Sequence, residues 1–506
     1  MLGAGYSFAL LLVFTLHIAR INAVSHEKDI QVTVPENAFQ HGDPHTVCVP
    51  TKWYNFVVFY LVNYFAHAAT VKTAPGEPFS LIILNMVSAL FFPYYGITRG
   101  IEAIYHHAIC YRGLDRAAHA GALCTIIRTN TWRPPANQTV KGISISETDD
   151  RYGFDVSLPL DLQEIDQGSR FCSRRVHGLY ALPPEGYGIA ILPPNTKILP
   201  NLPNIGTKDE REMTSDFKVS ATYSLVKGIT AAAQISFAIA TLVRTTSGVQ
   251  IEMFGYAAFG WTALPYLIMS AVNIAGSIAT PDYPTLYLVG SFELDEAARI
   301  AESIDGPDVT GFDGTVGRLI QDEDTSGTFE LSISGELKCR LTSRTADSPQ
   351  STDSPQRVIT INEESNERLK IPACACFNKE SARNWSKSSV HLFSVSISIL
   401  FGVIPYAVIG SLTGFQNGRS TLAERVLTQF WLATGIIIGA VLCPLLDHSL
   451  RSVLFQAERR TNRPKLLITV LFVAFYAAPA VGGYAIFTVE QRINFSTKRL
   501  VVTPIL

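Results

Sequence analysis

Long apolar stretches alternate with polar segments along this chain, and nearly all of its charged residues lie in the polar segments. A helix needs about 20 predominantly apolar residues to cross the hydrocarbon core of a bilayer, and its backbone groups must be satisfied within the segment. Stretches of about this length lie at residues 53–71, 79–97, 225–243, 254–279, 390–412, 426–446 and 466–488. The pattern predicts an all-α polytopic membrane protein with about seven transmembrane helices.

Two long polar segments separate these stretches and predict an extramembrane cap. Residues 99–224 follow the second stretch and residues 280–389 follow the fourth, so an even number of crossings lies between them. Both segments must therefore face the same side of the membrane. Proline-bounded apolar runs in the first, and alternating apolar residues at 328–341 in the second, are typical of strands. We expect a mixed α/β or irregular cap built from both loops.

The remaining boundaries follow from the same alternation. The first 23 residues have the short apolar core and small final residue of a signal peptide, and a retained anchor is the alternative. The expected division is a signal peptide at 1–23, an N-terminal extramembrane segment at 24–52, helices at 53–98, the first long loop at 99–224, helices at 225–279, the second long loop at 280–389 with a disordered part at 342–356, helices at 390–488 and a tail at 489–506.

Composition supports a membrane environment and argues against nucleic acid. Hydrophobic residues make up 47% of the 506 residues and charged residues 17%, below the roughly 25% of ordinary soluble domains. The net charge of −2 provides no basic field to attract a polyanion. The expected partners are the lipid bilayer and proteins bound through the long loops.

The orientation of the chain rests on two opposing signals. The signal peptide and the glycosylation sequons at Asn137 and Asn384 favour long loops that face the lumen or the cell exterior. The basic loop at 451–465 favours the opposite orientation, because short positive loops tend to stay in the cytoplasm. We favour the first orientation, which implies an integral membrane protein of the secretory pathway or plasma membrane and glycosylation at Asn137.

Polar residues within the apolar stretches are the first candidates for a functional site. Asn63, His67, Asn85 and Asn273 are proposed as an intramembrane polar cluster, with Asn63 and His67 one helical turn apart. The alternative is that these side chains only form hydrogen bonds between helices. No charged residue lies in the middle of a stretch, which argues against an ion-coupled pump or a voltage sensor.

Other constellations do not reach the pattern of a catalytic or metal site. Glu102, His106, His107, Asp115 and His119 are the residue types that bind zinc, but they lack the His-Glu-x-x-His spacing. A polar helix face near the membrane surface is the favoured interpretation. The acidic turn at 322–327 starts like a calcium loop, yet its twelfth position is an isoleucine, Ile333, and cannot supply the bidentate carboxylate. We therefore expect no catalytic residues, no metal and no cofactor.

One stretch resembles a known family. The residues concerned lie between Tyr223 and Phe292: Arg244, Gln250, Ile251, Glu252, the run Gly255-Tyr256-Ala257-Ala258-Phe259-Gly260, Pro265, Tyr266, Met269, Ser270, Asn273 and the run Pro281-Asp282-Tyr283-Pro284. They resemble a family of multi-pass membrane proteins of filamentous fungi that has no established activity. The resemblance implies a membrane protein and no particular chemistry.

The resulting functional hypothesis is a non-enzymatic multi-pass membrane protein whose long loops serve structure, sensing or partner binding. A channel or facilitator for an uncharged solute, lined by the polar cluster, is the first alternative. A seven-span receptor is the second alternative, although the spans lack the signature motifs of receptor families.

Overall fold

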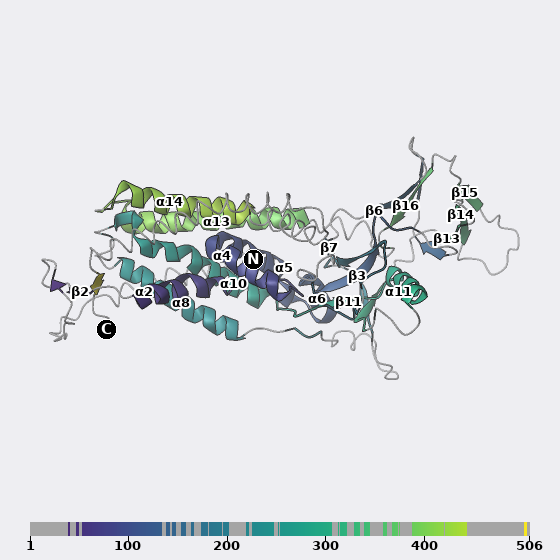
Figure 1. Ribbon diagram of the computed structural model, residues 1–506, viewed down its shortest axis with the longest axis horizontal. Helices are drawn as coiled ribbons and strands as arrows, with labels where there is room; N and C mark the ends of the chain where they lie inside the picture. Colours follow the sequence, from purple (N-terminus) through teal and green to yellow (C-terminus); the bar gives the residue numbers. More distant parts are fainter. Residues whose placement is uncertain are drawn as a thin grey trace.

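A computed structural model describes residues 53–133, 174–201, 219–320 and 387–442, apart from short gaps, together with Cys374 and short strands between residues 39 and 372 and at 500–502. The molecule is elongated, with long helices along one half and most strands gathered at the other end (Figure 1). We call the first part the helical body and the second the α/β body.

The helical body contains segments that run roughly along the long axis of the molecule (Figure 1). They are α2 (Trp53–Tyr60), the π-helix η1 (Leu61–Phe65), α3 (Ala66–Ala68), α4 (Phe79–Phe91), α5 (Pro93–His106), α8 (Leu225–Thr246), the 3-10 helices η3 (Gly255–Ala257) and η4 (Phe259–Ala263), α10 (Leu264–Ala279), α13 (Lys387–Thr413), α14 (Leu422–Ile437) and the π-helix η5 (Ile438–Leu442).

A five-stranded sheet forms the centre of the α/β body. Its order is β7 (Gln163–Ile165), β9 (Tyr187–Ile191), β3 (Leu123–Arg128), β11 (Leu286–Leu288) and β8 (Val176–His177). β11 runs parallel to β3 and β8, whereas β9 runs antiparallel to both of its neighbours. The short helices η2 (Ala108–Cys110) and α6 (Gly113–His119) lead into β3, and α11 (Phe292–Asp305) packs against it.

Smaller sheets join strands that are distant in the sequence. They contain β15 (Val358–Ile361), β14 (Cys339–Arg344), β13 (Thr328–Ile333) and β4 (Gln138–Lys141); β5 (Ser144–Glu147), β16 (Glu367–Pro372) and β6 (Gly153–Ser157); β10 (Ile198–Pro200) and β12 (Gly317–Leu319); and β1 (Phe39–Gln40), β2 (Val47–Val49) and β17 (Leu500–Val502). The first three of these sheets each pair strands from both long polar segments.

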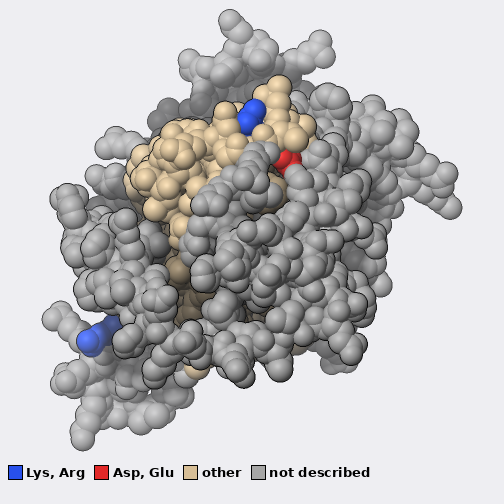
Figure 2. All heavy atoms as spheres, turned by 90° about the vertical axis from the view of Figure 1, so that its left-hand side faces the viewer, with Lys and Arg blue, Asp and Glu red and all other residues tan. Residues whose placement is uncertain are grey.

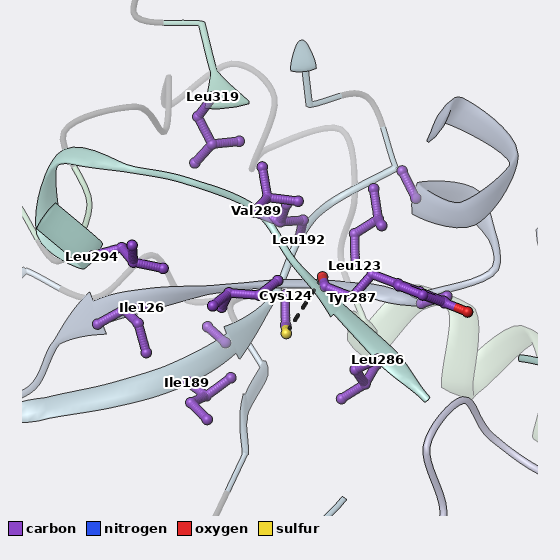
Figure 3. Packing of buried hydrophobic residues seen from close by; sticks show 14 of the residues in the cluster. Leu123, Cys124, Ile126, Ile189, Leu192, Leu286, Tyr287, Val289, Leu294 and Leu319 are labelled. Atoms are coloured by element: carbon purple, nitrogen blue, oxygen red, sulfur yellow. Dashed lines mark hydrogen bonds between the residues drawn. The ribbon is translucent and has the colours of Figure 1, made fainter. Parts of the chain in front are cut away.

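The core of the α/β body is apolar and closed to solvent. Side chains of β3, β9 and β11 form one apolar cluster with residues of α6 and α11, and Figure 3 shows Leu123, Ile126, Ile189 and Leu294 within this cluster. All three residues of β11 are buried, Leu286 and Leu288 on one face and Tyr287 on the other, consistent with an inner parallel strand covered on both faces.

The prediction of an all-α protein with about seven transmembrane helices, capped by two loops, is wrong. The described residues form a mixed α/β core, and within them only Gly260–Ala279 and Leu392–Thr413 are long and apolar enough to cross a bilayer. The first of these is 72% buried inside the protein. The physical reason is that hydropathy measures how favourably a side chain transfers out of water. Burial in a protein core provides that transfer as well as lipid does.

The apolar stretch at 79–97 shows how the prediction failed. It does not form one helix but divides at Phe92, whose backbone (φ −131°, ψ 82°) is not helical, and Pro93 then starts α5. Glu77 and Arg99, just before α4 and midway along α5, form an ion pair with a 2.8 Å N–O separation. The two short helices therefore form a hairpin that returns to its own end of the helical body, where Figure 1 shows them beside each other.

Other expectations are corrected or fall outside the described residues. The stretch at 53–71 is continuously helical from α2 through η1 to α3. The segment expected to be disordered at 342–356 begins as strand, because β14 continues to Arg344. The signal peptide, the expected glycosylation sites Asn137 and Asn384, the basic loop at 451–465 and the stretch at 466–488 lie outside the described residues.

Close packing of α5 on α10 is made possible by glycine. A Cβ on Gly100 would lie 2.8 Å from Asn273 Oδ1 and 2.9 Å from Val272 Cγ1, and a Cβ on Gly276 would lie 2.8 Å from the carbonyl oxygen of Gly100. The two backbones are too close for any side chain at either position.

Replacing Gly100 with alanine should therefore destabilise the helical body, by about 1–3 kcal/mol for an overpacked contact. The matched control is Gly228→Ala in α8, where a Cβ would meet nothing within 4 Å and should only improve helix propensity. Thermal unfolding should show a lower Tm for the first variant and an unchanged or higher Tm for the second. Equal Tm values for both variants would contradict the close-packing argument.

Candidate functional site

Polar side chains lie on the inner faces of the helices, between α2–α3 and α10. The Tyr64 hydroxyl lies 2.5 Å from Thr262 Oγ1, and His67 Nδ1 lies 2.6 Å from Ser270 Oγ. The Thr70 hydroxyl lies 3.2 Å from Ser270 Oγ and donates to the His67 carbonyl. These groups are all buried, so the helices meet through hydrogen bonds in a low-dielectric interior where such bonds are strengthened.

The predicted cluster of Asn63, His67, Asn85 and Asn273 does not form one group. Asn63 accepts a hydrogen bond from the Thr241 hydroxyl of α8 at 3.0 Å, and His67 contacts α10 through Ser270. Asn273 lies on the side of α10 that faces Gly100. The four residues are each at most 4% exposed, but they belong to different helix interfaces.

Asn85 belongs to a ring of charged and polar groups that lies between α4 and α5 of the hairpin. Its amide donates to Glu77 Oε2 at 3.2 Å, and its carbonyl oxygen accepts from the Tyr95 hydroxyl at 2.7 Å. Arg99 closes the ring by donating to Tyr95 at 3.1 Å and to Glu77 Oε1 at 2.8 Å. Each member forms hydrogen bonds with its neighbours in the ring, so the ring holds α4 and α5 together.

A second ion pair lies beside that ring. Lys72 Nζ donates to Asp282 Oδ1 at 2.5 Å and to the Thr280 carbonyl at 2.6 Å, while Arg99 Nε donates to the Lys72 carbonyl at 2.9 Å. The Lys72 and Asp282 side chains are 7% and 15% exposed. Sequence reasoning missed these residues because they flank the apolar stretches. The available signal was opposite charge at the ends of two apolar stretches, with Lys72 just after 53–71 and Asp282 just after 254–279.

A separate buried network lies in the α/β body. Arg128 of β3 donates to Glu296 of α11 at 2.6 Å and lies 3.6 Å from Glu293, and all three side chains are fully buried. Tyr187 donates to Glu296 Oε1 at 2.6 Å, and the Trp132 indole donates to the same oxygen at 3.1 Å. Burial alone would lower the pKa of Arg128, but the two carboxylates outweigh it and raise that pKa, so the guanidinium stays charged.

The enclosed position of this network favours a structural role. Burial, reinforced by Glu296, raises the pKa of the Tyr187 hydroxyl, which therefore stays protonated and donates. Neither carboxylate has a path to solvent in the described part of the chain, since both are fully buried. The network fastens α11 to β3 and orients the sheet.

The two buried cysteines, Cys124 and Cys374, have no signature of reactive thiols. Cys124 is fully buried, donates weakly to the Tyr287 carbonyl at 3.6 Å (Figure 3), and burial raises its pKa to about 12. The Cys374 thiol donates to Glu293 at 3.2 Å, and Cys110 is exposed.

The histidine and carboxylate constellation between 102 and 119 comes together at the junction of the two bodies. His119 stacks on Tyr111 with ring centroids 3.4 Å apart, and burial, aided by His107, lowers the His119 pKa against the effect of Asp115. α5 ends at His106 and α6 starts at Gly113, so a single polar helix face does not exist here. The described residues contain no group of three or more ligands placed to hold a metal ion.

Comparisons of the chain with protein-family models, curated proteins and solved structures find no match. The resemblance to a fungal membrane-protein family stays an expectation from the sequence. The function must be inferred from the chain's own geometry.

Removing the guanidinium from the α/β body should be strongly destabilising. Arg128→Met leaves Glu293 and Glu296 buried without a cation, which costs about 3–5 kcal/mol. Arg318→Met is the control, because it breaks an exposed pair with Asp295 that contributes about 0–1 kcal/mol. The urea midpoint of unfolding should be much lower for Arg128→Met than for Arg318→Met. Similar midpoints for both would show that the buried network does not stabilise the fold.

Proposed function

We propose that this chain is an integral membrane protein, with the helical body embedded in lipid and the α/β body presented outside the bilayer. The observation that carries the proposal is an inverted distribution of polarity. The helices turn apolar side chains outward and keep their polar side chains inside, the reverse of a water-soluble bundle.

Helix α13 has the clearest inverted pattern. Its outward face exposes Leu392, Ile399, Leu400 and Val403, whereas Ser394 and Ser398 are fully buried. Only 28% of the span Leu392–Thr413 is buried within the protein, although its mean hydropathy is 2.2. The 22 residues of this span extend about 33 Å at 1.5 Å per residue, enough to cross a hydrocarbon core of about 30 Å.

The same inversion recurs around the helical body. Exposed apolar residues repeat at helical spacing on single faces: Tyr54, Val57, Val58, Leu61 and Phe65 on α2–η1; Phe79, Ile83 and Val87 on α4; Ile229 and Phe237 on α8; and Leu422, Val426, Phe430 and Ile437 on α14. The opposite faces bury polar groups such as Asn63, Asn85, Gln234 and Thr428. Described atoms on the end face of the helical body in Figure 2 belong mostly to uncharged residues.

Energetics favour lipid as the covering medium. Burying one such side chain contributes about 1.5–3 kcal/mol, and soluble monomers rarely expose apolar patches above several hundred Å². The α4–α5 hairpin fits the same setting, since helices of 13 and 14 residues are too short to cross but can enter and leave on one side. Its non-helical turn at Phe92 is buried against η5, and Leu90 O accepts from Tyr266.

The proposed role is non-enzymatic. The helical body anchors the chain, and the α/β body, built from both long polar segments, supplies a folded surface for structure, sensing or partner binding. The support is the physical coupling of the two parts. The chain leads from α10 through Thr280 and Asp282 into β11, an inner strand of the sheet, and Lys72 binds both of these residues.

Membrane integration is tested by a substitution whose effect differs according to whether the exposed face of α13 contacts lipid or water. Val403→Lys places a charge near the middle of α13, which should cost about 2.5–3.5 kcal/mol of insertion free energy if the residue faces lipid. Val403 is 55% exposed, so in a water-soluble protein the same change would be nearly neutral. The wild type should stay in the membrane pellet after alkaline carbonate extraction, whereas the variant should be partly released or degraded.

The control is Gln416→Lys in the exposed turn after α13, which should remain in the pellet like the wild type. Release of the wild-type chain into the carbonate supernatant would overturn the proposal.

We also propose that the α/β body faces the lumen or the cell exterior. The sequon at Asn137 runs directly into β4, an edge strand of its sheet, which supports access of the glycosylation machinery. Endoglycosidase should increase the electrophoretic mobility of the wild type but not of Asn137→Gln. A wild type with no glycan shift, and an α/β body cut by protease added from the cytoplasmic side, would reverse the orientation.

A further inference from the structure

We infer that the inner side of α10, where it meets α3, α5 and α8, is a permeation site for small uncharged hydrogen-bonding molecules such as water or glycerol. This inference rests on the proposed membrane location. It goes beyond it by assigning a site and a class of solute.

The first observation is a set of buried polar atoms that lack partners within the described part of the chain. They are His67 Nε2, both amide atoms of Asn273 and the Gln234 carbonyl oxygen. The side chains are 0%, 1% and 6% exposed, respectively. An unsatisfied buried polar group costs about 1–3 kcal/mol, so several in one bundle call for a small polar ligand that pairs with them.

The second observation is that three of the helices carrying these groups meet at one level. Contacts from Tyr64 to Thr262 and from His67 to Ser270 show that α2–α3 and α10 run in the same direction. Gly260 packs against Thr245, so α8 runs opposite to α10. Gln234 lies about three turns before Thr245, which brings it to the level of Ser270 and His67.

The third observation is a polar seam along the length of α10. Thr262, Ser270, Asn273 and Thr280 occur from one end of η4–α10 to the other, and each is buried. Thr262 and Ser270 meet Tyr64, His67 and Thr70, next to Asn63 with its Thr241 partner. Asn273 and Thr280 face α5, at Gly100 and Ala103, so the seam passes from the α2–α3 interface to the α5 interface along α10. The π-helix η1 lies within this seam, and such wide turns occur often at functional sites.

The chemistry of the seam selects the class of solute. Its members are hydroxyls, amides and one imidazole, so it offers both donors and acceptors. The charged residues at its end are already engaged, Lys72 with Asp282 and Arg99 with Glu77. Within the described residues the seam has no spare charge to replace the hydration shell of an ion, so the solute it fits is uncharged.

Asn273→Leu gives the sharpest test. Leucine has the same branched shape and number of heavy atoms and removes both unpartnered amide atoms, so a merely structural site should keep or gain stability without further effect. If solutes pass the seam, the full-length wild type in proteoliposomes should raise water or glycerol permeability at least fivefold over empty liposomes. Asn273→Leu should remove most of that increase while its Tm stays equal or rises. Stopped-flow light scattering after an osmotic step gives the permeability.

Two matched variants, His67→Asn and His67→Gln, distinguish a contact of His67 with the solute from its contact with the neighbouring helix. Asparagine places its amide near the position of Nδ1 and can keep the bond to Ser270, whereas glutamine reaches the position of Nε2. Permeability should fall at least fivefold in His67→Asn and be retained better in His67→Gln. The opposite order would assign His67 to helix packing and overturn its role here.

The inference is overturned if wild-type vesicles are no more permeable than empty ones to either solute, once carbonate-resistant insertion has been verified. Failure of insertion itself would instead refute the proposed membrane location, so the two outcomes are distinguishable. Equal flux through the wild type and Asn273→Leu would also overturn the site.

Discussion

The close approach of α5 to α10 is the contact on which the rest of the helical body depends. At Gly100 and Gly276 the two backbones meet so closely that a methyl group on either would collide with the other helix. α13 and η5 pack in turn against α5, and Phe92 at the hairpin tip rests against Gly439 of η5. A shift of α10 would therefore move the hairpin, and the hairpin would move α13 and η5.

The same helix joins the two bodies of the molecule. The Thr280 hydroxyl at its end donates to the Ala103 carbonyl at 2.7 Å and accepts from the Ala108 amide at 3.4 Å. Lys72 binds the Thr280 carbonyl and Asp282, and the chain then enters β11 between β3 and β8. Buried charge pairs are weak sources of stability, but removing either partner is costly, which makes this junction specific.

Some elements could be predicted closely from local pattern and others could not. The apolar runs at 225–243 and 390–412 coincide with α8 and α13, because each is a single uninterrupted helix. The run at 79–97 was misassigned, since hydropathy averaged over a window passes across the break before Pro93. In the candidate site, Asn63, His67 and Asn273 were identified as buried polar residues, whereas their grouping with Ser270, Thr241 and Gln234 was not, and Asn85 belonged elsewhere.

The sequence by itself determined the uninterrupted apolar helices, α8 and α13, and which polar residues lie within them, because periodicity, proline and caps act on neighbours along the chain. The α14 start is such a case, with Thr421 and Glu424 bonding reciprocally in a capping box. Only the tertiary structure decided whether an apolar face meets lipid or protein, which strands of distant segments pair, and whether a buried amide finds a partner. These outcomes depend on contacts between residues hundreds of positions apart, such as His67 with Ser270, which no local pattern encodes.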